Sequence, residues 1–133
     1  MTVDEYRAVC EKKFRGKAAA SEHDLQTQCV NWFRYTHQSY AKLLFAIPNG
    51  SKRSRFERIQ ALQEGLLSGV PDLYLAVARN GYHGLWIEMK NGKAGKVSDN
   101  QAEMIARLRE EGYACYVCRT FDEFEDCINK YMK

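Results

Sequence analysis

The spacing of hydrophobic and polar residues predicts four helices and four strands in a mixed order. Apolar residues three and four apart predict helices over about 21–37, 54–67, 98–111 and 120–131. Short runs rich in aliphatic, β-branched and aromatic residues predict strands over 42–47, 72–78, 85–90 and 113–119. The resulting order is helix, strand, helix, hairpin, helix, strand, helix. It predicts an α/β fold in which a mixed central β-sheet is flanked by helices on both faces.

Polar residues mark where these helices begin. Ser21 precedes the first helix, and Ser98 with Gln101 and Thr120 with Glu123 form capping boxes before the last two. The residues expected to face the core are Leu25, Cys29, Trp32, Phe33 and Thr36 in the first helix and Phe124, Cys127, Ile128 and Tyr131 in the last.

The predicted hairpin brings acidic residues together. A turn at Asn80-Gly81 pairs residues whose numbers sum to about 161, so Asp72 falls beside Glu88 to within one residue. Glu88 and Lys90 are two residues apart and therefore project from the same face of their strand. The intervening Met89 projects from the other face, with Leu85 and Ile87, and these three are expected in the core.

This convergence of charges favours a metal site. Two neighbouring carboxylates are costly to bury unless a cation compensates them. Carboxylate and carbonyl oxygens are the ligands that Mg²⁺ and Mn²⁺ prefer, and such ions assist phosphodiester hydrolysis. The alternative from spacing alone is an exposed salt-bridge network at the end of a strand, which contributes little energy.

Composition indicates one ordinary globular domain. The chain has 133 residues, of which 45% are hydrophobic and 28% charged, and its net charge is +3. No apolar run approaches the ~18 residues of a membrane span. The N-terminus has no apolar signal segment, so a cytoplasmic, nucleoid-associated location is expected. We expect residues 1–20 to form a partly helical extension and residues 21–133 a single domain.

The five cysteines are interpreted as reduced thiols, because no secretory signal accompanies them. Cys115 and Cys118 form a CxxC pattern. Residues three apart in a strand point to opposite faces, however, so these two sulfurs are expected to diverge. No second pair exists to complete a zinc site.

Several motifs, taken together in this order, resemble a known family. They are Ser21-Glu22, Ile47-Pro48-Asn49-Gly50, Gly69-Val70-Pro71-Asp72, Glu88-Met89-Lys90 and the capping box from Ser98 to Gln101. Pro71-Asp72 followed by Glu88-Met89-Lys90 resembles the PD-(D/E)XK nuclease motif. The wider set resembles the VRR-NUC family of that superfamily, in particular its stand-alone phage and bacterial members, and covers about residues 20–133.

The resemblance implies a restriction-endonuclease-like fold and a DNA nuclease that depends on Mg²⁺ or Mn²⁺. Asp72, Glu88 and the Met89 backbone carbonyl would hold the metal, and Lys90 would be the catalytic lysine. Glu22 would approach the metal directly or through water. Gln101 would position the water or the phosphate. Glu22 and Gln101 also have simpler interpretations, as a favourable charge in the first turn and as a helix cap.

The expected partner is DNA. Basic or polar loop residues are candidates for binding it: Asn49, Lys52, Arg53, Arg55, Lys93 and Lys96. The resemblance implies a homodimer that cuts branched DNA such as four-way (Holliday) junctions, and a two-fold dimer suits two symmetric incisions. No membrane and no nucleotide cofactor are expected. The alternatives are a general or restriction-type nuclease for flap or duplex DNA and a non-catalytic DNA-binding module.

Overall fold

The computed structural model describes Glu5, residues 21–48 and residues 54–133. The predicted extension over residues 1–20 therefore lies, apart from Glu5, outside the described residues. The described helices are α2 (Glu22–Thr36), the 3₁₀ helix η1 (Gln38–Leu43), α3 (Arg55–Gln63), α4 (Asp99–Glu110) and α5 (Phe121–Tyr131). The strands are β1 (Leu44–Ala46), β2 (Leu73–Leu75), β3 (Leu85–Met89) and β4 (Ala114–Cys118). None of the helices in the described part of the chain is long and apolar enough to cross a membrane.

The four strands form one mixed sheet in the order β1-β2-β3-β4. β2 pairs antiparallel with both β1 and β3, whereas β3 and β4 pair in parallel. β2 and β3 pair with Leu73 opposite Ile87, which is within one residue of the predicted register. The strands are shorter than predicted: β2 ends at Leu75, and beyond it the hairpin closes through a single bridge between Arg79 and Tyr82.

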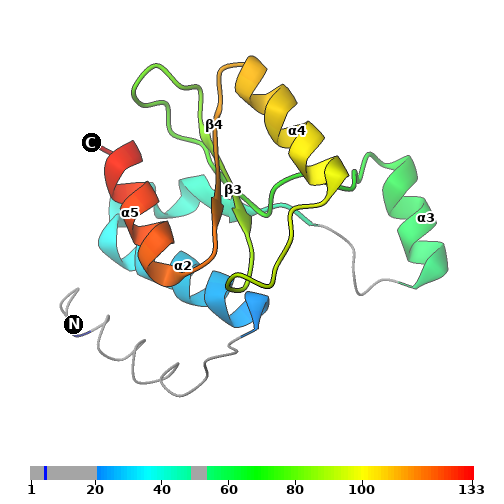
Figure 1. Ribbon diagram of the computed structural model, residues 1–133, viewed down its shortest axis with the longest axis horizontal. Helices are drawn as coiled ribbons and strands as arrows, with labels where there is room; N and C mark the ends of the chain where they lie inside the picture. The colour runs from blue at the N-terminus through cyan, green and yellow to red at the C-terminus, as the bar shows by residue number, and fades with distance from the viewer. Residues whose placement is uncertain (1–4, 6–20, 49–53) are drawn as a thin grey trace.

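Helices lie on both sides of the sheet, as predicted, with α2 and α5 on one side and α4 on the other (Figure 1). The predicted core residues of β3, namely Leu85, Ile87 and Met89, are fully buried among side chains of α2 and α5. Those helices contribute Leu25, Cys29, Trp32, Phe33, Phe124, Ile128 and Tyr131 to the same core. The predicted caps are also present: the side chains of Ser21, Ser98 and Thr120 each accept a backbone hydrogen bond from the first turn of their helix.

The predicted thiols are free. Cys29, Cys115, Cys118 and Cys127 form no disulfide, while Cys10 lies outside the described residues. Cys118 belongs to the core on the α2 and α5 side of the sheet. Cys115 and Cys118 of the CxxC pattern are thus two buried thiols of strand β4.

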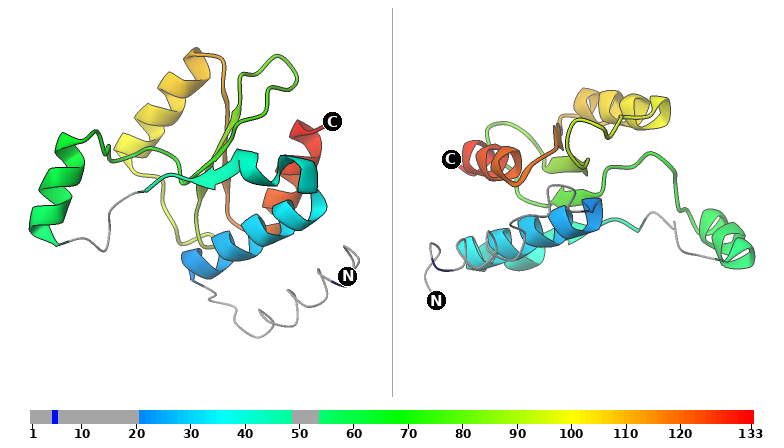
Figure 2. Two further views of the ribbon diagram at one scale, coloured as in Figure 1. Left: turned by 180° about the vertical axis from the view of Figure 1, so that it is seen from behind. Right: turned by 60° about the horizontal axis from the view of Figure 1, so that its bottom comes forward.

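The largest departure from expectation is α3. Ser54 caps this helix, which ends at Gln63, several residues before the predicted Leu67. α3 projects away from the sheet and the other helices, on the right of Figure 1 and at the edge of both views in Figure 2. Of its residues, Ala61 alone is buried, and Phe56 keeps 74% of its surface exposed. The apolar spacing therefore predicts the helix correctly, although the apolar residues find no core within the described chain.

Candidate active site

Asp72 and Glu88 meet at the open end of the β2–β3 pair. Because Leu73 lies opposite Ile87, Asp72 falls opposite Glu88, and directly opposed residues share a face of the sheet. Both carboxylates are nearly inaccessible to solvent, with 8% of Asp72 and 2% of Glu88 exposed. Such burial excludes the exposed salt-bridge network that spacing alone allowed.

The residues directly before strand β2 explain the geometry around Asp72. The amide of Met89 donates a hydrogen bond of 2.8 Å to Asp72 Oδ2. Continuing the β2–β3 register by two residues places Pro71 opposite Met89, and proline has no N–H to donate to the Met89 carbonyl. The Pro71-Asp72 sequence thus leaves a main-chain oxygen without its ladder donor beside the two carboxylates.

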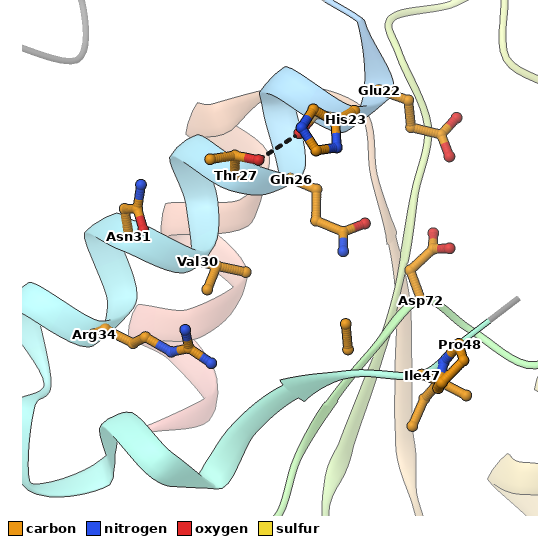
Figure 3. Close-up of a pocket in the computed structure, with 11 residues that line it drawn as sticks. Glu22, His23, Gln26, Thr27, Val30, Asn31, Arg34, Ile47, Pro48 and Asp72 are labelled. Atoms are coloured by element: carbon orange, nitrogen blue, oxygen red, sulfur yellow. Dashed lines mark hydrogen bonds between the residues drawn. The ribbon is translucent and has the colours of Figure 1, made fainter. Parts of the chain in front are cut away.

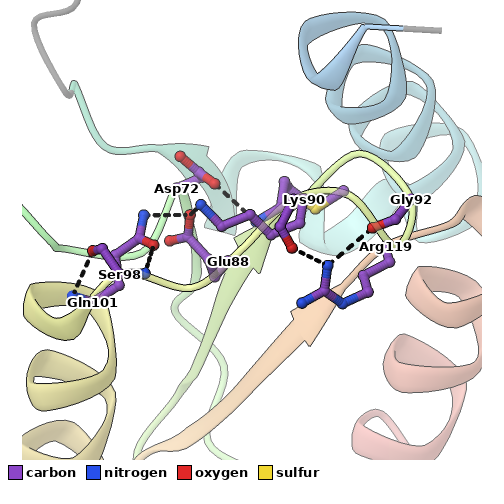
Figure 4. A network of polar contacts seen from close by, with 9 residues as sticks. Asp72, Glu88, Lys90, Gly92, Ser98, Gln101 and Arg119 are labelled. Carbon is purple, nitrogen blue, oxygen red and sulfur yellow. Dashed lines mark hydrogen bonds and ion pairs between the residues drawn. The ribbon is translucent and has the colours of Figure 1, made fainter. Parts of the chain in front are cut away.

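Glu88 is held by one of its two oxygens. Oε1 accepts a hydrogen bond of 3.0 Å from Gln101 Nε2 and lies 3.5 Å from the Lys90 ammonium (Figure 4). The other oxygen, Oε2, is buried and has no hydrogen-bond partner among the described residues. A buried carboxylate oxygen without a donor is costly, and it is also an available ligand position.

Burial raises the pKa of Glu88 to about 8, and the negative charge of Asp72 and a side-chain hydrogen bond of the protonated Glu88 to Asp72 contribute to the shift. The Lys90 ammonium acts in the opposite direction but does not cancel these effects. Without a cation, Glu88 is therefore mostly protonated at neutral pH. A divalent ion would compensate this site by stabilising both carboxylates in their charged form.

Gln101 caps α4, as one of its two interpretations predicted, and also contacts Glu88, while its role toward water or phosphate stays a prediction. Its side-chain oxygen accepts from the Ser98 amide at 2.9 Å and completes the capping box of α4. Its side-chain nitrogen donates to Glu88 at the same time. The helix cap thus fixes the amide group that orients the carboxylate.

Lys90 is followed by a loop that a distant arginine holds in place. Arg119, directly after β4, donates to the carbonyl of Gly92 at 2.9 Å and also to that of Gly95. A Cβ added at Gly95 would lie 3.1 Å from the Lys90 Cβ, so a larger residue would crowd the lysine. Lys93 and Lys96 are exposed on this loop, as expected of residues that contact a polyanion.

Glu22 lies at the first turn of α2, near Asp72 but outside the contacts of Glu88. Its pKa is raised, first by partial burial and then by the negative charge of Asp72, while Lys90 lowers it. Glu22 and Asp72 both line a cavity between α2 and β1 (Figure 3). Among the described residues, no three His, Cys, Asp or Glu side chains are close enough to hold a metal together. A direct or water-mediated metal contact of Glu22 therefore stays a prediction.

The predicted DNA-binding residues are dispersed. Asn49, Lys52 and Arg53 lie outside the described residues. Arg55 is exposed at the start of the projecting α3, whereas Lys93 and Lys96 belong to the loop after β3. The described residues do not gather these cations into one patch.

Sequence reasoning missed the polar face of α2. Glu22, Gln26 and Arg34 line the cavity together, and their spacing in multiples of four is the signal that could have identified this face. It also missed Arg119, because no local pattern indicates that this side chain reaches the carbonyls of a loop more than twenty residues earlier.

Comparison with known proteins agrees with this architecture. The family model of the VRR-NUC domain matches residues 1–122. A solved structure described as a VRR_NUC domain protein superposes with a TM-score of 0.75 at 27% sequence identity, covering 86% of this chain and 89% of that one. No curated protein sequence matches the chain. The chain belongs to the VRR-NUC domain family, and it is accordingly a nuclease that acts on DNA.

Proposed function

We propose that the protein is a Mg²⁺- or Mn²⁺-dependent endonuclease that hydrolyses phosphodiester bonds in branched DNA, including four-way junctions, as a homodimer. The observation that carries the metal dependence is the buried Glu88 Oε2, which has no donor among the described residues and lies beside a second buried carboxylate, Asp72. An arrangement of this kind is costly unless a cation completes it.

The donor set fits a hard divalent cation. Asp72, Glu88 and the Met89 carbonyl would hold it through oxygen atoms alone, which matches the preference of Mg²⁺ and Mn²⁺. When bound there, the ion would supply a bound water of lowered pKa and compensate the charge that develops on the scissile phosphate.

The remaining residues orient the reactants. Lys90, 3.5 Å from Glu88 Oε1 and only 12% exposed, presents a positive charge at the site and would stabilise the phosphate as its negative charge increases. Gln101 fixes Glu88 through its 3.0 Å hydrogen bond. Glu22, at the mouth of the α2–β1 cavity, would accept a hydrogen bond from the attacking water.

The exposed apolar stripe of α3 supports the homodimer. Phe56, Ile59 and Leu62 recur at helical spacing, and 74%, 48% and 48% of their surfaces are exposed. A nine-residue helix is marginal in water unless its apolar face packs against something. A second copy related by a two-fold axis would cover this self-complementary stripe and would present two sites to the two strands of a junction.

Substrate profiling tests this function. Linear duplex, flap and four-way junction DNA of shared sequence are incubated with the full chain in Mg²⁺, in Mn²⁺ and in EDTA. Metal-dependent cutting that is fastest on the four-way junction supports the proposal. Equal cutting of all three DNAs identifies a general nuclease instead, and binding without cutting in either metal identifies a non-catalytic module.

A further inference from the structure

A cavity of about 560 Å³ lies beside the catalytic carboxylates, between α2 and β1. Its size is within the range of small-ligand sites in proteins. Figure 3 shows Asp72 and Glu22 at one end and Arg34 toward the other, with Gln26 between them. Asp72 and Glu22 thus form one end of a longer site, and the proposed chemistry leaves the rest of it unexplained.

The two ends of the cavity differ in charge. Glu22 and Asp72 make one end acidic, and Arg34 places a guanidinium at the other. Arg34 uses one N–H group to donate to the Leu44 carbonyl at 3.1 Å. A guanidinium carries five N–H donors, so others can contact a ligand in the cavity. Arginine is suited to phosphate oxygens because its donors form a planar fork.

The walls between these ends suit a nucleoside. Gln26, Thr27 and Asn31 project polar groups from one face of α2. Across the cavity, Ala46, Ile47 and Pro48 provide an apolar surface. Amide groups can hydrogen-bond to a sugar or base edge, and the apolar surface can contact its flat side.

We propose that this cavity binds the nucleotide next to the cleaved phosphodiester. Its neighbouring phosphate lies on Arg34, and its sugar and base lie between Gln26 and the apolar surface of Ala46 and Ile47. This inference rests on the proposed nuclease function, because that function places the scissile phosphate at the Asp72 end. It assigns Arg34 and Gln26 to substrate binding and makes the cut strand run along α2.

The test measures binding and is carried out in EDTA with the full chain and a fluorescein-labelled four-way junction. Arg34→Gln is expected to weaken binding about tenfold. It should also lower the slope of log Kd against log salt concentration by about one, because one phosphate contact is lost. Arg34→Lys keeps the charge and is expected to restore the salt dependence. Arg107→Gln is the matched control, because Arg107 is an exposed arginine on α4 that pairs with Glu110.

Chemical modification of the DNA backbone identifies the phosphate that Arg34 contacts. A neutral methylphosphonate replaces the phosphate on either side of the mapped cleavage position. At one of the two positions it is expected to weaken wild-type binding about tenfold and to add nothing in Arg34→Gln, because both changes remove the same contact. Gln26→Leu is expected to weaken binding about threefold with an unchanged salt dependence.

The outcomes separate this inference from the proposed function. If the wild-type chain cuts DNA while Arg34→Gln binds as tightly as Arg107→Gln, the nucleotide site is wrong and the nuclease stands. The nucleotide site is also wrong if the methylphosphonate effect adds in full to that of Arg34→Gln. If the wild-type chain cuts no DNA in either metal, the catalytic proposal fails instead. Thermal melting of each variant shows whether loss of the Arg34 bond to Leu44 has affected folding.

Discussion

The candidate active site and helix α3 depart from the usual burial pattern in opposite ways, since one buries charged groups and the other exposes apolar ones. At the end of the β2–β3 pair, two carboxylates are buried, and one oxygen of Glu88 lacks a donor among the described residues. On α3, a phenylalanine and two aliphatic residues are exposed to solvent. A buried charge without compensation and an exposed apolar stripe both carry a free-energy cost in the isolated chain.

Under the proposed function, each region is completed by something outside the described chain, and the chemistry of the two partners differs. Two buried carboxylates are compensated either by protonation of one of them or by a cation, and the proposed function assigns a divalent cation to this pair. An exposed apolar stripe requires another apolar surface, because burial removes it from water. The following predictions test the two regions separately.

The largest effect is expected on cleavage. Glu88→Ala and Lys90→Ala should each lower the rate of junction cutting about a hundredfold or more, because each removes a charge that acts on the reacting phosphate. Binding should change little by comparison. Glu110→Ala and Lys130→Ala are matched controls on exposed residues of α4 and α5, and they should cut at the wild-type rate. Wild-type cutting by both site variants would show that the buried pair serves only the fold.

Metal binding should stabilise the fold. At a Mn²⁺ concentration of about a hundred times its Kd, the free energy of unfolding should rise by about 2.7 kcal/mol, since the ion binds only the native site. Thermal melting with Mn²⁺ and after EDTA treatment measures the change. Glu88→Ala should remove it, and a melting temperature that is insensitive to Mn²⁺ in the wild type would argue against a metal site.

Disrupting the stripe of α3 should affect assembly and leave the fold intact. Phe56→Glu with Ile59→Glu should weaken the dimer by about 2 kcal/mol, or roughly thirtyfold in Kd, because both side chains would leave the interface. Sedimentation across a concentration series measures this. Gln60→Glu adds a charge to the same helix at a polar position and should leave assembly unchanged. A wild-type chain that is monomeric at every concentration would remove the second copy from consideration.

Metal-free stability should depend on pH, and the effect of any one pH unit should be smaller than the effects above. Because the pKa of Glu88 rises from an ordinary 4.5 to about 8 in the native state, this group makes the protein less stable as pH increases through that range. Glu88→Gln keeps the shape without the charge. It should match the wild type near pH 4.5, and the advantage in its free energy of unfolding should grow by up to about 1.4 kcal/mol for each pH unit up to about pH 8. Denaturant unfolding in EDTA tests this, with Glu110→Gln as the control that shows no such dependence.

Much of the candidate site followed from local sequence. The turn at Asn80-Gly81 predicted the pairing of Asp72 with Glu88 to within one residue, because hairpin register depends on the turn and on the alternation of side chains. The capping box at Ser98 and Gln101 likewise depends only on residues three apart. Both features are set within a short stretch of chain, so the sequence predicted them.

Other features depend on contacts between distant segments. The Arg119 bonds to the loop after Lys90 and the cavity between α2 and β1 join residues that no local pattern relates. The exposure of α3 is of the same kind, because helical spacing specifies an apolar face and not what covers it. By itself, the sequence determined the elements other than η1, the hairpin register to within one residue and the identity of the acidic pair. Only the tertiary structure decided how deeply that pair is buried, which oxygen is left without a donor and which apolar face remains open, because burial depends on how distant elements pack.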